Sequence, residues 1–338
     1  MINRTAIIVE AGDPRPDHDA GSVAVIDLAH GLSRLGFDTS IETETRPDLL
    51  ATALSEPRDV VIFSRPATFV RNFPRVRGGH SKIVYFAHDL HFLRISLGLE
   101  VEGIESNLAP AVMKSIEGYC FENAHVSLLP TEDEVDHIEN EWGDVNARQV
   151  NYFLMRPAPY REPFESSRGL VFVGSRDHAP NRDGIVWFVR NVLPKINELH
   201  PNLVLTLVGD WETEFHNGPN VKVMGNISDR ELSELLSRSL IGISPLRFGA
   251  GMKRKTLHYL ASGLPVVSTD FGLQGISADV GRRRSALKAS VPEDWVAAIS
   301  SLQSQPDYWT ALSKNALSFI SEHFSEEAYL ARLFAALD

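Results

Sequence analysis

Cysteine is nearly missing from this chain of 338 residues: Cys120 is its single example and cannot form an intramolecular disulfide. No group of cysteine and histidine residues has the spacing of a zinc site. A chain without disulfides is typical of a reducing compartment. The N-terminal segment turns acidic after a short apolar run, which is not the pattern of a signal peptide. We therefore expect a cytoplasmic protein.

Long apolar runs and an excess of basic residues are also missing. No segment has the roughly 20 apolar residues that a membrane-spanning helix needs. With 33 basic and 44 acidic residues, the formal net charge is −11, which would repel a nucleic-acid backbone outside a local basic patch. We expect no nucleic-acid partner and no stable membrane insertion. The arginines at 282–284 could touch lipid headgroups at the inner face of the membrane or an acidic acceptor, although a solvated turn explains them more simply.

Two nucleotide motifs and a metal motif are absent as well. Neither the Walker pattern G-x-x-x-x-G-K-[ST] nor G-x-G-x-x-G follows a predicted strand, which argues against a kinase, a nucleotide triphosphatase and a dinucleotide-binding enzyme. His88 and His91 form an H-x-x-H pair without a third ligand in view, so we expect no zinc site and no metal cofactor. His88 instead follows a predicted strand, where it is suited to be a hydrogen-bonding group of an active site.

What the chain does contain is an alternation of apolar strands and amphipathic helices. Residues 5–12, TAIIVEAG, form a short apolar run that predicts a buried strand. Residues 22–36 then place apolar side chains on one helical face, with Ser22 as the expected N-cap and Gly36 as the stop. Further strands are predicted at 59–64, 81–88 and 125–130. Continuously apolar strands separated by helices indicate a parallel sheet covered on both faces.

The same alternation restarts after a proline-rich stretch at 155–169, which we interpret as a linker. Strands in this second half are predicted at 170–175, 203–210, 221–225, 240–246 and 265–270. The chain is longer than one ordinary core requires. We therefore predict an α/β fold of two doubly wound, Rossmann-like domains at 1–155 and 156–323. A helical tail at 324–338 could cross back to the first domain.

One loop of the second domain combines glycine with positive charge: PLRFGAGMKRK at 245–255. It lies between a predicted strand and a predicted helix, where unpaired N–H groups attract anions. Gly249 and Gly251 let the backbone approach a ligand closely, and Arg247 and Lys255 add full charges. This combination suits a diphosphate, although a solvated charged face would also explain the run of cations.

Several stretches resemble a known enzyme family. Residues 172–196, 203–210 and 243–269 are similar to the donor-binding domain of the family-4 retaining glycosyltransferases, and 19–22 (DAGS) and 87–94 (AHDLHFLR) are similar to their N-terminal domain. The resemblance implies the GT-B architecture of two facing Rossmann-like domains. It also implies a hexosyltransferase that uses a nucleotide diphosphate sugar as donor, retains the anomeric configuration and needs no metal. The acceptor would be a hydroxyl of a glycan, a lipid-linked sugar or a protein.

The resemblance also implies roles for individual residues. Arg247 and Lys255 match the cations that hold the donor diphosphate, and His88 matches a position near the reacting sugar, so these three are the expected catalytic residues. The backbone of 225–227 matches the segment beside the nucleobase. The full set of expected donor-binding residues is Gly21, Gly174, Gly225, Asn226, Ile227, Gly249, Ala250, Gly251 and His258.

His258 departs from the family pattern, which usually has a glutamate here to bind the donor ribose. A neutral imidazole can still hydrogen-bond a ribose hydroxyl, with one acceptor nitrogen in place of a carboxylate. Two other functions stay open: a sugar-nucleotide epimerase on the same architecture, and a non-catalytic glycosyltransferase-like subunit that binds a partner. Trp211, at the end of a predicted strand, could stack on the nucleobase or cover the edge of its domain.

Overall fold

The computed structural model describes residues 4–16, 19–76, 81–104, 106–216, 218, 220–276 and 285–338. The chain divides into two compact units. The first comprises Met1–Leu154 with Ala250–Met252 and Phe324–Asp338, and the second comprises Met155–Gly249 with Lys253–His323. Each unit has its own six-stranded sheet and its own hydrophobic core. The predicted α/β fold with two parallel sheets is confirmed.

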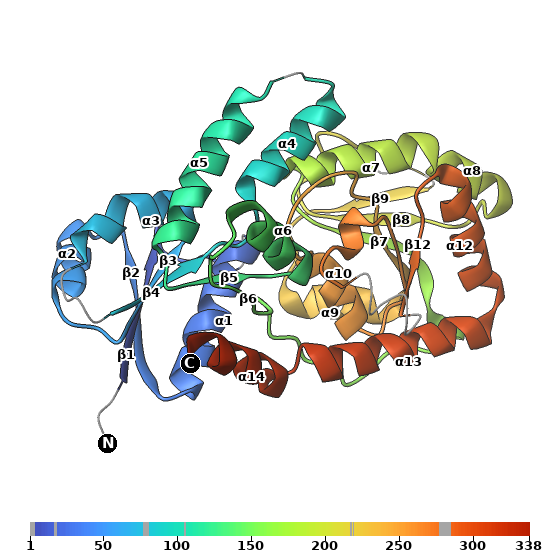
Figure 1. Ribbon diagram of the computed structural model, residues 1–338. Coiled ribbons are helices and arrows are strands. Elements are labelled where there is room, and N and C mark those ends of the chain that lie inside the picture. Colours follow the sequence, from blue (N-terminus) through green and yellow to red (C-terminus); the bar gives the residue numbers. More distant parts are fainter. Residues whose placement is uncertain are drawn as a thin grey trace. The chain divides into compact units, whose positions relative to one another are not determined.

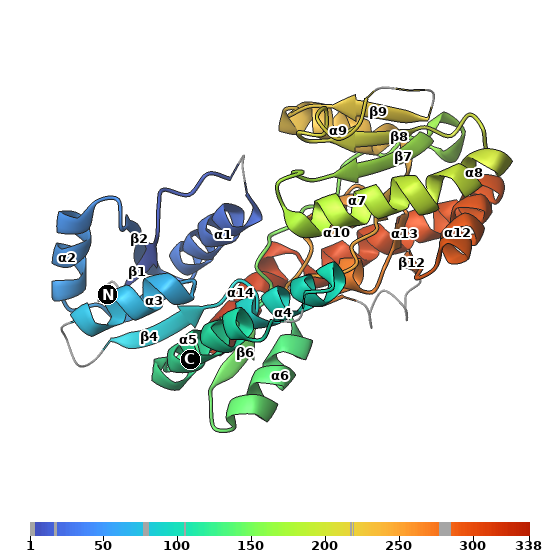
Figure 2. The same ribbon diagram turned by 90° about the horizontal axis from the view of Figure 1, so that it is seen from above.

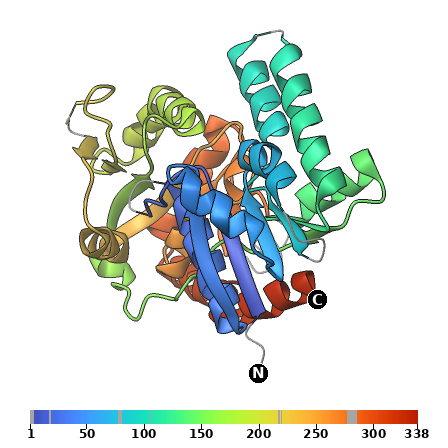
Figure 3. The same cartoon turned by 90° about the vertical axis from the view of Figure 1, so that its left-hand side faces the viewer.

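The sheet of the first unit has the strand order β2-β1-β3-β4-β5-β6, and its neighbouring strands all run parallel (Figure 1). Its strands are β1 (Arg4–Glu10), β2 (Phe37–Thr43), β3 (Val60–Ser64), β4 (Lys82–Phe86), β5 (Val126–Leu129) and β6 (Ala147–Gln149). Its helices are α1 (Ala20–Arg34), α2 (Pro47–Ser55), α3 (Pro66–Asn72), α4 (His91–Glu102), α5 (Leu108–Asn123), α6 (Glu132–Trp142) and α14 (Glu326–Leu337), with a 3-10 turn at Phe73–Arg75. The helices α4 and α5 lie side by side (Figure 3).

The C-terminal helix α14 belongs to the first unit, although the sequence places it after the second. It packs against α1, and the approach is so close that a Cβ on Gly31 would lie 2.5 Å from Cε1 of Tyr329. The Lys82 ammonium donates a hydrogen bond of 2.6 Å to the carbonyl of Leu337. Burial of Tyr329 and these contacts hold the end of the chain on the first unit.

The start of α1 differs from the prediction. Ser22 was expected as the N-cap, but Asp19 takes that position: its carboxylate accepts hydrogen bonds from the Ser22 N–H at 2.8 Å and from the Ser22 hydroxyl at 2.7 Å. A carboxylate is as good a capping group as a hydroxyl and also favours the positive end of the helix dipole. The N-cap therefore lies three residues earlier than expected, and the helix begins at Ala20 and includes Gly21 in its first turn.

The second unit has the strand order β12-β11-β10-β7-β8-β9, again all parallel. Its strands are β7 (Arg168–Val173), β8 (Leu205–Val208), β9 (Val221–Met224), β10 (Ser239–Ser244), β11 (Val266–Ser268) and β12 (Ala286–Lys288). Its helices are α7 (Ala179–Asn191), α8 (Leu193–Leu199), α9 (Asp229–Arg238), α10 (Arg254–Ala261), α12 (Pro292–Ser304) and α13 (Pro306–His323), with 3-10 turns at Phe164–Ser166 and Phe271–Leu273. Figure 2 shows α7 beside the sheet of the second unit. Ile185 and Phe188 of this helix belong to the same buried core as Leu170 and Phe172 of β7.

Candidate functional site

The candidate site in the second unit is built from loops at one edge of its sheet. Parallel strands end at a common edge, where ligands of open α/β sheets bind. The loops that leave β7, β9 and β10 there contain the predicted residues Gly174, Gly225, Asn226, Ile227, Arg247 and Gly249. Helix α10, which follows the β10 loop, adds Lys255 and His258. The second unit therefore collects most of the residues that were expected to bind the donor.

Lys255 lies in the first turn of α10, and its ammonium is held in a fixed place. It donates a hydrogen bond to Oδ1 of Asn181 and lies 4.7 Å from the centre of the Phe172 ring. The amide of Asn181 donates its own hydrogen bond, of 2.8 Å, to the carbonyl of Ser175, so its oxygen is the atom that faces the lysine. Burial, together with the positive charge of Lys253, lowers the pKa of Lys255 to about 7. An anion placed beside this ammonium would stabilise its charged form.

Arg247 is paired with a carboxylate of the same helix that positions Lys255. Its Nε donates to Oδ2 of Asp183 at 2.8 Å, and its Nη2 donates to Oδ1. This bidentate contact orients the planar guanidinium, and its hydrogen bonds raise the pKa of Arg247. Asp183 and Asn181 are two residues apart in the first turns of α7. One helix therefore orients both cations that were predicted to hold a diphosphate.

Two glycines bring these groups close together. Gly184 of α7 approaches the loop after β10 so closely that a Cβ on it would lie 2.4 Å from the carbonyl oxygen of Pro245. A Cβ on Gly174 would lie 2.7 Å from Nδ2 of Asn181 and 3.2 Å from Nζ of Lys255. Gly174 was expected at this site, and its role here is to leave room beside the lysine.

Lys253, a third cation of this loop, contacts a segment other than the helix α7 that Arg247 and Lys255 contact. Lys253 is the N-cap of α10 and donates to Oε1 of Gln274 at 3.3 Å. Gly249 has φ of 137°, a conformation that side chains rarely adopt. The two predicted phosphate-binding cations, Arg247 and Lys255, are thus the ones that contact α7, and Lys253 contacts a different segment.

The segment after β9 was expected beside a nucleobase. The Asn226 side chain donates to Oδ1 of Asp210 at 2.9 Å, and a Cβ on Gly225 would lie 3.2 Å from Oε1 of Glu212. Trp211 does not take part in base stacking, because its ring is fully buried and its indole N–H donates to the carbonyl of Gly174 at 2.9 Å. The alternative was that Trp211 covers the edge of its domain; the structure places it in the buried core of the second unit.

His258 lies on α10 and is half-buried. Burial, with the positive charge of Arg254 as a second cause, lowers its pKa to about 4. The ring is therefore neutral at physiological pH and has one donor and one acceptor nitrogen. This is the chemical state in which a histidine could replace a ribose-binding glutamate.

The first unit has a polar cluster at the corresponding edge of its own sheet. His88 follows β4, and its Nε2 lies 2.7 Å from the hydroxyl of Ser64 at the end of β3. That hydroxyl donates to Oε2 of Glu10, the last residue of β1, at 2.6 Å. The other oxygen of Glu10 accepts from Nη1 of Arg65 at 2.5 Å. Three neighbouring strands thus end in one hydrogen-bonded chain.

Backbone strain and close packing mark this cluster. His88 and Arg65 are the two non-glycine residues with positive φ among the described residues, at 68° and 70°. Such strain is often found at functional sites. A Cβ on Gly21 would lie 2.4 Å from Nη2 of Arg65 and 3.3 Å from Nδ1 of His88. Gly21 was predicted to lie near the donor, and the structure brings it together with His88. Burial, followed by the charge of Arg65, holds the pKa of His88 well below its ordinary value.

Ala250 and Gly251 group with the first unit. The N–H of Gly251 donates to Oε1 of Glu134 at 3.1 Å, and a Cβ on Gly251 would lie 2.9 Å from Cβ of Asp89. With φ of 71°, Gly251 also has a backbone conformation that favours glycine. The predicted closeness of this glycine to a ligand stays a prediction, and its approach to Asp89 is a packing reason for glycine.

The two histidines of the H-x-x-H pair have different partners: His88 contacts Ser64, and His91 lies beside two carboxylates. His91 lies 3.3 Å from Oε1 of the fully buried Glu117 and 3.1 Å from Oδ1 of Asp89. Burial opposes its charged form, but the contacts with Glu117 and Asp89 prevail and raise its pKa. Within the described part of the chain, no three His, Cys, Asp or Glu side chains are grouped so that they could hold a metal ion.

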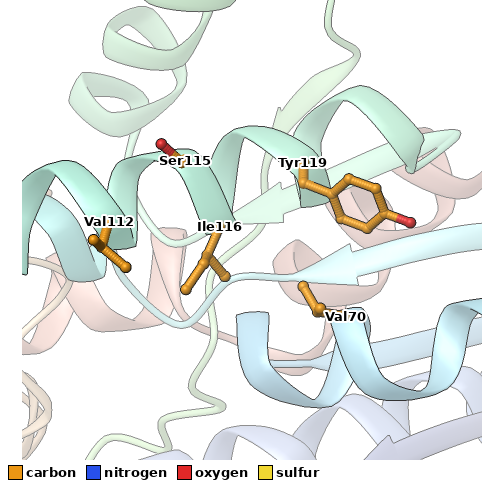
Figure 4. Close-up of a pocket in the computed structure, with 5 residues that line it drawn as sticks. All are labelled: Val70, Val112, Ser115, Ile116 and Tyr119. Carbon is orange, nitrogen blue, oxygen red and sulfur yellow. The ribbon is translucent and has the colours of Figure 1, made fainter.

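An apolar groove of about 360 Å³ lies between α3 and α5 of the first unit (Figure 4). Its walls are Val70, Val112, Ser115, Ile116 and Tyr119. None of these five side chains is charged, so the groove has no group that could hold a phosphate. The groove therefore differs in chemistry from the charged and polar groups at the strand ends of the two sheets.

Five residues of these clusters were missed in the sequence: Asn181, Asp183, Glu10, Ser64 and Arg65. The available signal was the presence of polar residues directly after or at the end of a buried strand, as in FVGSRDHAPNRDG and in the glutamate that ends TAIIVE. Their partners are 24 to 74 residues away in the sequence, so the contacts themselves required the fold.

Comparisons with known proteins give one family match and one curated relative. A family model described as Glycosyl transferases group 1 matches residues 167–305. An uncharacterized 44.6 kDa protein in the cps region of Klebsiella pneumoniae is 24% identical over 191 residues, which are 54% of this chain and 49% of that protein. The match thus spans about half of the length of this curated relative.

Solved structures with the same architecture cover nearly the whole chain. Sucrose-phosphate synthase from Thermosynechococcus elongatus has a TM-score of 0.76 at 15% identity, over 98% of both chains. WaaG, a glycosyltransferase involved in lipopolysaccharide biosynthesis, has a TM-score of 0.65 at 13% identity, also over 98% of both chains. At such identities the likeness shows the fold, which is GT-B with two Rossmann-like domains. Membership of family 4 in particular stays a prediction.

None of the helices in the described ranges has the length and apolar character that crossing a membrane requires. The arginines at 282–284, considered for a peripheral contact, lie outside the described residues.

Proposed function

We propose, on the premise that the chain is a GT-B glycosyltransferase with a Glycosyl transferases group 1 domain, that it transfers a sugar from a nucleotide diphosphate sugar to an acceptor hydroxyl. Transfer retains the anomeric configuration and uses no metal ion. The observation that supports this most is the pair of cations at one sheet edge: Lys255 and Arg247 are each oriented by a side chain of α7.

In the proposed mechanism the two cations bind the diphosphate and stabilise the charge that it develops as the glycosidic bond breaks. Charged groups that are already held in place do not have to reorient as this charge develops, so little free energy is spent on reorganisation. Asn181 and Asp183 provide this order for Lys255 and Arg247. The cations supply positive charge that a divalent metal would otherwise supply. The departing phosphate guides the acceptor hydroxyl to the same face of the sugar, which gives retention.

Other residues have supporting roles in the proposal. His88 lies beside the transferred sugar, Gly21 and Gly251 leave room for the donor, and the backbone of 225–227 contacts the nucleobase. His258 hydrogen-bonds a ribose hydroxyl. The acceptor is a glycan, a lipid-linked sugar or a protein, and the reaction takes place in the cytoplasm or at the inner face of the membrane.

A transfer assay tests the proposal. The purified chain is incubated with a panel of nucleotide sugars and acceptors, with and without a chelator. We expect release of the nucleotide diphosphate that depends on acceptor, a product with retained configuration, and a rate that neither chelator nor added Mg²⁺ changes. Formation of a free epimerised sugar nucleotide would instead support the epimerase. A strict need for a divalent ion would contradict the role given to the cations.

The affinity for the donor is expected to fall as the pH rises above 7. In the protein without donor, Lys255 has a pKa of about 7. A bound diphosphate raises this pKa because it stabilises the charged ammonium. Binding between the two pKa values therefore takes up a proton, and Kd rises by about tenfold per pH unit. A nucleotide sugar is the proper ligand, since its phosphates do not titrate in this range. His258, with a pKa of about 4, does not titrate there either.

Calorimetry in buffers of different ionisation enthalpy measures this proton uptake directly. The Lys255→Met variant, which has a similar chain length and no ammonium, should bind more weakly and without proton uptake. A wild-type Kd that is constant from pH 7 to 9 would show that Lys255 does not contact the phosphates of the donor.

Replacing His258 by alanine is expected to weaken donor binding by about 1 kcal/mol, the net contribution of one hydrogen bond. His258→Glu should keep or improve the affinity for uridine or guanosine donors, because a carboxylate offers two acceptor oxygens to a ribose. Titration of each variant with the donor gives the comparison. Equal affinity in all three proteins would mean that His258 is only a residue of the helix surface.

A further inference from the structure

We propose that Glu10 and Ser64 are positioning residues that fix His88 in the tautomer with its proton on Nε2, so that Nδ1 faces the ligand as a hydrogen-bond acceptor. The inference rests on the proposed function, in which His88 lies beside the transferred sugar. It adds the direction of the hydrogen bond: a hydroxyl of the ligand donates, and the histidine accepts.

The direction of each hydrogen bond follows from Glu10. Its Oε1 accepts from the N–H of Ala11 at 2.8 Å and from Nη1 of Arg65 at 2.5 Å, and its Oε2 accepts from the Ser64 hydroxyl at 2.6 Å. Ser64 has a single hydroxyl proton, and this proton is used in the bond to Glu10. The 2.7 Å contact between Ser64 and His88 therefore requires a proton on Nε2 of the histidine.

Burial makes this arrangement a stable one. Glu10 is 3% exposed and Ser64 is fully buried, so solvent cannot replace a lost partner. Reversing one bond of a buried chain leaves a polar atom without a partner, which costs more free energy than in water. Burial also favours the neutral ring of His88. A neutral imidazole with a proton on Nε2 has its lone pair on Nδ1.

Nδ1 is turned toward Gly21 in the first turn of α1, a residue that was expected near the donor. It lies 3.3 Å from the position that a Cβ on Gly21 would take, and the absence of that Cβ lets the Arg65 guanidinium approach the same place. Among the residues that the structure describes, none is hydrogen-bonded to Nδ1 of His88, which is half-buried. The positive φ of His88 holds the ring in this orientation at a cost in backbone strain.

The test reads the tautomer directly. Protein labelled with ¹⁵N in its 12 histidines gives two-bond ¹H–¹⁵N correlations whose pattern distinguishes the two neutral tautomers, and the signals of His88 are those missing from the His88→Gln variant. We expect the wild-type protein to have its proton on Nε2. A proton on Nδ1 overturns the proposal.

Glu10→Gln is the decisive variant, because it keeps the shape of the side chain. Arg65 and Ala11 are both donors, so they hold the amide oxygen and turn the amide NH₂ toward Ser64. The Ser64 hydroxyl then accepts from the amide and donates to Nε2 of His88, and the proton of the ring moves to Nδ1. We expect the tautomer to reverse and kcat/KM to fall about tenfold, the effect of about 1.4 kcal/mol.

Two serine variants separate positioning from structural loss. Ser64→Ala should leave a mixture of tautomers, and Ser64→Thr, which keeps the hydroxyl, should restore the Nε2 form. Ser127→Ala is the matched control, since Ser127 is a buried serine of β5 in the same sheet, and it should leave the His88 signals unchanged. Melting temperatures show whether each variant is folded.

The outcomes distinguish this proposal from the proposed function. An unchanged tautomer in folded Glu10→Gln overturns the positioning role, whatever the activity is. A reversed tautomer with unchanged kcat/KM overturns the link between tautomer and transfer. If the wild-type chain transfers no sugar from any donor, the proposed function fails in its own assay, and the spectra still decide which nitrogen of His88 carries the proton.

Discussion

Replacing Lys255 by alanine is expected to lower kcat/KM by about 30-fold or more, and Arg247→Ala should have an effect of the same size. Removing one partner of a desolvated charge pair typically costs roughly 2–5 kcal/mol, and about 1.4 kcal/mol corresponds to a tenfold change in rate. Both cations are oriented by side chains of α7, and alanine at either position offers no group that replaces the lost charge. Steady-state kinetics with the best donor of the transfer assay measure the fall in kcat/KM.

Lys253→Ala is the matched control for this prediction. It removes a charge two residues from Lys255, but its ammonium contacts Gln274 and not Asn181. Its loss should change kcat/KM little and should not lower it, because removing Lys253 also removes one cause of the lowered pKa of Lys255 and so favours the charged ammonium. Equal and small effects of all three substitutions would mean that the run of cations is a solvated face.

Separate values of kcat and KM for the Lys255→Ala and Arg247→Ala variants show whether the contact with the diphosphate strengthens during the reaction. If the contact with the diphosphate strengthens as the leaving group gains charge, kcat falls along with kcat/KM. If the contact is equally strong in the ground state, only KM rises. We expect kcat to fall for both variants, because the proposed mechanism has no metal ion to share the developing charge.

The fold could be predicted from the sequence where strands are buried on both sides. The apolar runs at 5–12, 59–64 and 81–88 correspond to β1, β3 and β4, which pair in the interior of the first sheet. The strand β2 was missed, because it lies at the edge and its residues FDTSIET are mostly polar and partly exposed. Such a strand has no continuous apolar run, and its partner is supplied by the tertiary fold.

The candidate site could be predicted at the level of single residues and not of contacts. Glycines and cations at a helix start pointed to Arg247 and Lys255, but nothing local linked them to Asp183 and Asn181. The N-cap of α1 was placed wrongly at Ser22, since both Asp19 and Ser22 are good capping residues and local sequence did not decide between them. Trp211 was left open for a similar reason: only packing decides whether an aromatic ring is buried.

Replacing Gly184 by alanine is expected to destabilise the second unit by about 2 kcal/mol, even though alanine is the better helix former. At an exposed helical position the change would stabilise by up to about 1 kcal/mol. Here the new Cβ would lie 2.4 Å from the carbonyl oxygen of Pro245, 3.0 Å from its carbonyl carbon and 3.2 Å from Cα of Leu246. These are backbone atoms and cannot rotate away, so the helix and the loop have to separate, and overpacking of this kind typically costs about 1–3 kcal/mol.

Moving α7 away from the loop should also weaken the contact between Asp183 of α7 and Arg247 of the loop. Asp183 precedes Gly184 on α7 and Arg247 follows Leu246 on the loop, so their bidentate contact is formed across the same approach. We therefore expect a melting temperature lower by roughly 4–8 °C, together with a loss of kcat/KM in the protein that remains folded. Gly12→Ala is the control, because a Cβ there meets no atom within 4 Å, and it should change neither quantity. A Gly184→Ala protein as stable as the wild type would show that α7 does not approach the loop this closely, and the argument that one helix orients both cations would lose its support.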